Sequence, residues 1–226
     1  MRLTMSRAAA VRVLPFVAFM ALLGLRGAAP ADGSWGFDPR WIYAVTVLVV
    51  GGLLLAFRHD YGELSRQTLP EVRQALMAAA VGLVVFVLWI HLDAPWMTLG
   101  DATASFVPLR LDGSLDGPLV AVRWIGATLM VPVMEELFWR SFLMRWIQRP
   151  GFLGVDPMRV GPRAIVLSTF LFVLAHPLWL AATIAGLAYA ALYVATGRLW
   201  NAVIAHAVTN GALGVWVVVT RSWAFW

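Results

Sequence analysis

The sequence contains no cysteine and no lysine. Without cysteine, the chain can form no disulfide and can use no catalytic thiol. All 17 basic residues are arginines, and they are scattered over the connections between apolar segments, so the net charge of +5 does not indicate nucleic-acid binding. Charged residues make up only 13% of the 226 residues, about half of their share in soluble domains, which argues against a soluble fold.

Hydrophobic residues make up 61% of the chain, which is typical of a polytopic membrane protein. We predict an all-α fold, a transmembrane helical bundle of about seven spans (six to eight), in a single membrane domain over residues 1–226. The first apolar stretch follows three arginines and looks like a signal peptide, but we favour an uncleaved first helix. The spans are expected near 13–29, 41–57, 73–91, 119–144, 163–178, 180–196 and 199–219.

The arginines also predict how the bundle is oriented, because arginine-rich connections stay in the cytoplasm. The N-terminus, the connection 58–72 and the connection 145–163 together carry nine arginines. The connection 92–118 has four aspartates and one arginine, so we expect it on the opposite side. This alternation predicts a cytoplasmic N-terminus, an outer C-terminus and the lipid bilayer as a partner.

Two of the four glutamates, Glu135 and Glu136, are adjacent and lie inside a predicted span. An ionisable residue in a span is costly, so it usually faces the bundle interior and carries function. Glu136 and Arg140 are four residues apart and can form an ion pair on one helix face. Glu135 lies about 100° around the helix and lacks that partner. A desolvated carboxylate of this kind suits a general base.

Three further polar residues are expected inside spans: His176, His206 and Asn210. His206 and Asn210 are four residues apart, so their N–H groups can point at one developing oxyanion. His176 could orient a water molecule together with Glu135. At about 1.5 Å of rise per residue, Glu135, His176 and His206 lie roughly 15, 20 and 10 Å from the cytoplasmic ends of their spans. Three helices therefore bring polar groups to a similar depth.

Each of these residues also has a plainer interpretation. Glu136 with Arg140 could be an ordinary ion pair, and a membrane histidine or asparagine often only joins neighbouring helices. A non-catalytic immunity or scaffold protein is therefore one alternative, although a scaffold need not retain the whole set. A proton-coupled transporter is another, but it would be expected to show two related halves, and none is visible in the sequence.

Three motifs resemble those of the CAAX-protease and bacteriocin-processing (CPBP, Abi) family of intramembrane proteases. They are E-E-x3-R at residues 135–140, F-x3-H at residues 172–176 and H-x3-N at residues 206–210. The resemblance covers about residues 119–215, the expected catalytic core, whereas the helices of residues 1–118 carry no family motif. The stretch 131–146 also resembles the CAAX prenyl protease-related branch associated with exosortase systems.

The resemblance implies a bacterial inner-membrane endopeptidase that cleaves a membrane-associated protein or peptide without a covalent intermediate. It implies an all-helical bundle whose cavity opens toward the cytoplasm. It assigns activation of water to Glu135 with His176, stabilisation of the oxyanion to His206 with Asn210, and shaping of the site to Glu136 with Arg140.

The sequence lacks the H-E-x-x-H motif of zinc proteases. Two histidines and two glutamates could nevertheless bind Zn²⁺. We expect that no metal or other cofactor is required.

Overall fold

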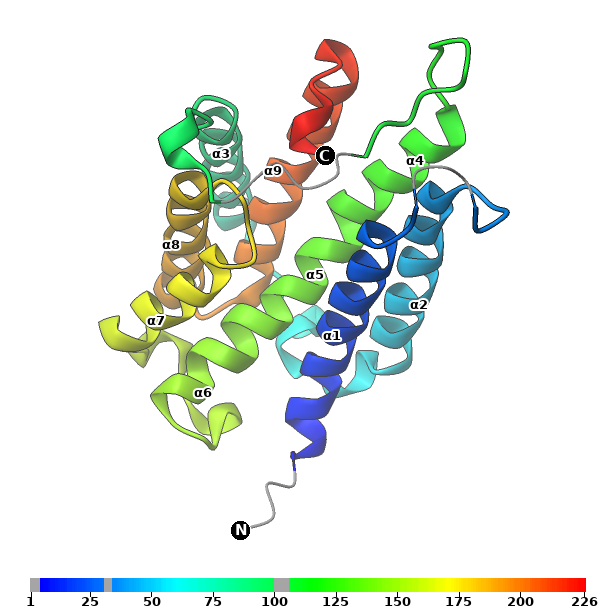
Figure 1. Cartoon of the computed structure of the whole chain (residues 1–226). Coiled ribbons are helices and arrows are strands. Elements are labelled where there is room, and N and C mark those ends of the chain that lie inside the picture. Colours follow the sequence, from blue (N-terminus) through cyan, green and yellow to red (C-terminus); the bar gives the residue numbers. More distant parts are fainter. Residues whose placement is uncertain (1–4, 31–33, 100–105) are drawn as a thin grey trace.

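The computed structural model describes residues 5–30, 34–99 and 106–226, and over these ranges the chain is a helical bundle without β-strands (Figure 1). A single long helix of residues 117–148 runs through the bundle, in which π-helical stretches separate α4, α5 and α6. The helices are α1 (Arg7–Gly27), α2 (Ile42–Ala56), α3 (Val72–Trp89), α4 (Gly117–Ile125), α5 (Val131–Glu136), α6 (Arg145–Gln148), α7 (Pro162–Val173), α8 (Trp179–Thr196) and α9 (Leu199–Thr220).

Among the described residues, six helices are long and apolar enough to cross a membrane, which confirms the predicted polytopic bundle. Two of the predicted boundaries are wrong. The first helix begins at Arg7 instead of residue 13, because the Ser6 side chain accepts a hydrogen bond from the Ala9 amide and caps the helix there. The span expected over 163–178 is helical only to Val173, shortly before Pro177.

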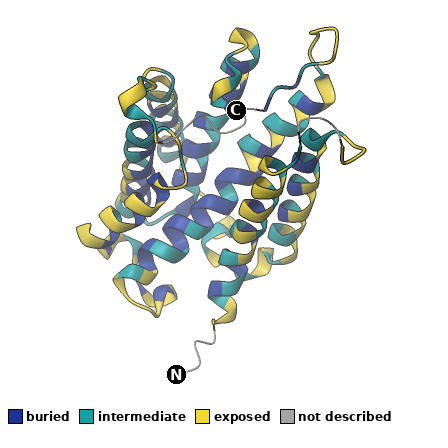
Figure 2. Ribbon diagram, viewed as in Figure 1, coloured by how far each residue is buried: buried dark blue, intermediate teal, exposed yellow. Residues whose placement is uncertain are grey.

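The connections gather at two ends of the bundle (Figure 1). The amino-terminal end carries the start of α1 and the connections 57–71 and 149–161. The carboxy-terminal end carries the described parts of the connections after α1 (28–30 and 34–41) and after α3 (90–99 and 106–116), and the segment that follows α9. Buried residues concentrate along the helix 117–148 and on the sides of its neighbours that face it (Figure 2). Glu135, Glu136 and Arg140 therefore lie on one of the most enclosed helices, and His206 lies on another, α9.

A buried ion pair between Arg12 and Glu63 stabilises the packing of the helices at the amino-terminal end of the bundle. Arg12 is 1% exposed and donates to both carboxylate oxygens of Glu63, at 2.8 and 2.7 Å. It also donates to the Ser141 hydroxyl at 3.2 Å, and Ser141 in turn donates to Glu63. Burial raises the pKa of Glu63, but the hydrogen bonds and charge of Arg12 outweigh burial and hold it below its ordinary value. The pair joins α1 to the connection after α2 and to the long helix.

We predict that Arg12→Gln destabilises the fold far more than Arg7→Gln. Breaking one side of a buried pair costs about 3–5 kcal/mol, whereas Arg7 is 74% exposed and water screens its pair with Asp60. Because the folded pKa of Glu63 is lowered, its contribution is present above its unfolded pKa and is lost as the pH falls through the folded value. Thermal unfolding in detergent at several pH values measures both effects, and equal midpoints for the two variants would contradict the prediction.

Helices α3 and α9 approach each other closely at Gly82. The Thr209 hydroxyl donates to the Gly82 carbonyl oxygen at 2.9 Å. A Cβ atom on Gly82 would meet the Ala205 carbonyl oxygen at less than contact distance. Small residues permit such close packing between membrane helices, and this contact supports the part of α9 that carries His206.

We expect Gly82→Ala to lower the yield and thermal stability of the folded protein, because overpacking of a rigid contact costs about 1–3 kcal/mol. Gly52→Ala is the matched control: Gly52 also lies inside a helix, but a Cβ atom there meets nothing within 4 Å. The control should be neutral or slightly stabilising. The unfolding midpoints of the two variants test this prediction. An unchanged midpoint for Gly82→Ala would contradict it and would show that α3 and α9 can move apart.

Candidate active site

The two glutamates lie between two π-helical stretches of the long helix, Gly126–Met130 and Leu137–Met144. π-Helical turns in a regular helix are rare and often mark functional sites. Glu136 is fully buried and Arg140, on the second stretch, is 3% exposed. The sequence predicted a regular α-helix here, because nothing in its apolar pattern distinguishes the two kinds of turn.

Glu136 is the centre of a buried ionic network. Its carboxylate accepts from Arg140 Nη1 at 3.3 Å and from His206 Nδ1 at 2.8 Å. The ion pair predicted for Glu136 and Arg140 is therefore present. Arg140 Nη2 also donates to the Gly186 carbonyl oxygen at 3.2 Å. The network joins the long helix to α8 and α9.

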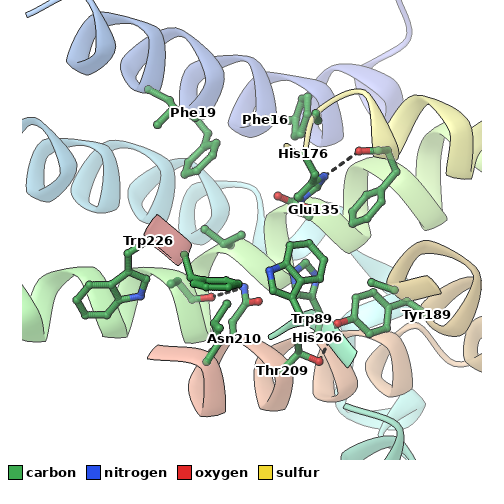
Figure 3. A pocket seen from close by; sticks show the side chains of 18 of the residues that line it. Phe16, Phe19, Trp89, Glu135, His176, Tyr189, His206, Thr209, Asn210 and Trp226 are labelled. Carbon is green, nitrogen blue, oxygen red and sulfur yellow. Dashed lines mark hydrogen bonds between the residues drawn. The ribbon is translucent and has the colours of Figure 1, made fainter. Parts of the chain in front are cut away.

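Glu135, His176, His206 and Asn210 line one cavity of about 210 Å³ (Figure 3). The cavity lies between α1, the long helix, α8 and α9. Glu136 and Arg140 do not line it and lie behind its wall. The four residues predicted to act on substrate are thus brought together, and the two predicted to shape the site lie outside the cavity.

Glu135 and His176 lie side by side in this cavity (Figure 3). Glu135 is 7% exposed, and its Oε2 has no hydrogen-bond partner among the described residues. His176 lies on the non-helical connection 174–178, not on a helix as predicted. Its Nδ1 bonds to the Phe172 carbonyl oxygen at 2.8 Å, which leaves Nε2 of a neutral ring as a proton acceptor. Both side chains can therefore take up a proton.

Aromatic packing and backbone bonds hold the His176 connection in place. The imidazole lies 4.3 Å from the Phe172 ring centre and 5.9 Å from that of Trp89 at the end of α3. The Pro177 carbonyl oxygen accepts from the Leu99 amide at 2.7 Å. The connection after α3 is thus docked on the connection that carries His176.

His206 and Asn210 differ from the predicted arrangement. His206 Nδ1 is committed to Glu136, so Nε2 can donate to an oxyanion only when the ring is protonated. The ring stacks on Tyr189 with centres 5.0 Å apart. Asn210 Nδ2 donates to the Ala127 carbonyl oxygen at 2.9 Å and retains a second N–H. One donor from each residue remains for substrate.

Sequence reasoning missed a second polar chain beside the site. The Tyr189 hydroxyl donates to the Thr209 hydroxyl at 2.8 Å, and Thr209 donates to Gly82. Both side chains line the cavity. The signal in the sequence was a tyrosine in the alanine-rich α8 and a threonine beside Asn210, but neither belongs to the three motifs.

The cavity extends to the carboxy-terminal end of the bundle, where its lining includes Arg123 and Trp226. This is the end opposite the arginine-rich connections (Figure 1). From the sequence we expected the arginine-rich connections in the cytoplasm and a cavity that opens toward the cytoplasm. In this structure the cavity extends to the end opposite those connections, so the two expectations conflict.

Among the residues that the structure describes, no three histidine or carboxylate side chains are placed to hold one metal ion. Nδ1 of His176 and Nδ1 of His206 are already hydrogen-bonded. The geometry does not favour the zinc alternative, and the expectation that no metal is required stays a prediction.

The different contacts of Glu135 and Glu136 predict that substituting each residue has a different effect on the stability of the protein. Glu136→Gln leaves Arg140 buried without its carboxylate, so it should cost about 3–5 kcal/mol of stability. Glu135→Gln removes no ion pair or hydrogen bond among the described residues and should leave the unfolding midpoint nearly unchanged. The double variant Glu136→Gln with Arg140→Met should recover part of the loss. Thermal unfolding of the purified variants tests this, and equal destabilisation by both single changes would refute it.

Residues 117–212 match a protein-family model described as Type II CAAX prenyl endopeptidase Rce1-like. The match confirms the family resemblance seen in the motifs. All six residues singled out from the sequence lie within the matched segment. The same comparisons find no match among curated proteins and none among solved structures.

Proposed function

Because residues 117–212 belong to the CAAX-protease family, we propose that this chain is an intramembrane endopeptidase that hydrolyses a peptide bond of a membrane-associated protein or peptide. The observation that carries the proposal is the cavity in which the Glu135 carboxylate lies beside the His176 imidazole, opposite His206 and Asn210 (Figure 3). A general base and oxyanion donors in one enclosed site are what hydrolysis by water requires.

In the proposed reaction, a water molecule between Glu135 and His176 attacks the carbonyl carbon of the substrate. Glu135 accepts a proton from the water as the new C–O bond forms. The tetrahedral intermediate then collapses, the C–N bond breaks, and Glu135 returns the proton to the leaving nitrogen. His176 accepts a hydrogen bond from the water through Nε2 and orients it. No covalent bond to the enzyme forms.

The oxyanion of the intermediate would be stabilised by protonated His206 and the free N–H of Asn210. Glu136 is bonded to His206 Nδ1 and so fixes the orientation of the ring, whose Nε2 is the atom that would donate to the oxyanion. Arg140 balances the remaining charge of Glu136 from the other side. Loss of one oxyanion donor typically costs about 10²–10³-fold in rate, and the roles of Glu136 and Arg140 are to position the donor.

The experiment compares new protein termini in membranes of cells that express wild-type chain, Glu135→Gln or Glu71→Gln. Glu71→Gln makes the same substitution at the exposed N-cap of α3, which does not line the cavity. Removal of a general base costs about 10²–10⁴-fold in rate, so a terminus generated by wild type and Glu71→Gln should vanish in Glu135→Gln. Identical termini from all three, at equal protein levels, would favour the non-catalytic scaffold.

A further inference from the structure

Arg123 is a charged residue on α4 that has no anionic partner. It lines the same cavity as Glu135, at the carboxy-terminal end of the bundle. Among the described residues its side chain makes no ion pair or hydrogen bond, and its Nε is buried without a partner. Arg12, Arg40 and Arg140 each pair with a carboxylate. The buried Arg145 also lacks a carboxylate, but its guanidinium donates to the Val155 and Leu153 carbonyl oxygens, whereas Arg123 has no such acceptor among the described residues.

Three aromatic rings hold the Arg123 guanidinium in place. Its central carbon lies 4.6 Å from the ring centre of Tyr43, 5.8 Å from that of Phe106 and 6.0 Å from that of Trp226. The rings attract a cation but accept none of its N–H groups in the usual geometry. The cluster therefore leaves a preorganised fork of donors for an anion.

The depth of Arg123 indicates which anion this is. The midpoint of the 32-residue helix lies near residue 132. Arg123 is about 14 Å from this point along the axis at about 1.5 Å per residue, and half of a hydrocarbon core is about 15 Å. An α-helical side chain also leans toward the helix N-terminus, which here is the outer end of the helix. The guanidinium therefore lies in the outer part of the bilayer, on the side of the lipid phosphates.

The wall next to Arg123 is also open to lipid. Met20 and Leu23 of α1 line the cavity and are themselves 40% and 36% exposed on the outside of the bundle. A ligand that entered here would have a polar group at Arg123 and an apolar chain along α1. This division matches a glycerophospholipid better than a soluble anion.

We propose that the mouth of the cavity is a binding site for an anionic glycerophospholipid, whose phosphate makes bidentate hydrogen bonds with Arg123 and whose acyl chain lies against Met20 and Leu23. Arginine recognises phosphate through two parallel N–H bonds. The bound lipid borders the entrance to the candidate active site, so membrane composition controls access to it. The binding site itself does not depend on the proposed hydrolysis.

The test uses purified protein in nanodiscs of phosphatidylcholine with or without one-fifth phosphatidylglycerol, and native mass spectrometry counts the phosphatidylglycerol retained. Wild type should retain it, and Arg123→Gln should retain about 10- to 100-fold less, as expected for loss of a charged hydrogen bond. Arg221→Gln is the control, because Arg221 is an exposed arginine at the same end of the bundle. Unfolding midpoints in pure phosphatidylcholine verify that each variant is folded.

If Arg123→Gln does not fold, Arg123→Lys replaces it, which keeps the charge but loses the bidentate geometry and should lower retention by a smaller factor. Inorganic phosphate should not displace the lipid, and displacement by phosphate alone would identify a soluble-anion site. Equal retention by wild type and Arg123→Gln would overturn the proposal. The proposal would also be overturned if apolar peptides with a free C-terminal carboxylate displaced the lipid and their carboxamides did not. That result would identify a substrate-anchoring site. Lipid retention is measured without catalytic turnover. A negative result would therefore overturn the lipid site and would not bear on the proposed hydrolysis.

Discussion

The structure depends on how Glu136, Arg140 and His206 neutralise one another inside an apolar bundle. A single charge at this depth would be too costly, so each side chain is retained only with its partners. The network joins the long helix to α8 and α9, and Arg140 further packs over the Phe172 ring at 4.6 Å. The carbonyl oxygen of Phe172 holds His176. Glu136 and Arg140, which lie outside the cavity, therefore help to orient both histidines that line it.

The same network explains why two neighbouring carboxylates have different environments. Glu136 is paired with both a guanidinium and an imidazole, whereas Glu135 lines the cavity and forms no ion pair among the described residues. Two bare carboxylates at adjacent positions would repel and suppress each other's ionisation. The compensation of Glu136 removes much of that repulsion. The pair of glutamates therefore combines a buried ionic anchor with a carboxylate that faces the cavity.

Much of this arrangement could be predicted from the sequence, because apolar runs locate the helices and an i,i+4 spacing locates the pair of Glu136 and Arg140. The end of α7 could not, since the run "FLFVLAHPLWL" is apolar throughout and only Pro177 hints at the break. The partner of His206 lies 70 residues away, and that of Arg12 lies 51 residues away. Such contacts depend on how the helices pack, which spacing within one helix does not reveal.

The shortness of α7 has a consequence for the surrounding membrane. Its 12 residues span roughly 18 Å, against about 30 Å of hydrocarbon. The bilayer beside α7 must thin to match it. The irregular backbone of residues 174–178 can lie at such a depth only when it is buried in protein or beside a hydrated cavity. Ala175 and His176 of this connection line the cavity that holds Glu135. If the proposed hydrolysis takes place there, the break after α7 is where its second reactant, water, can be accommodated within the bilayer.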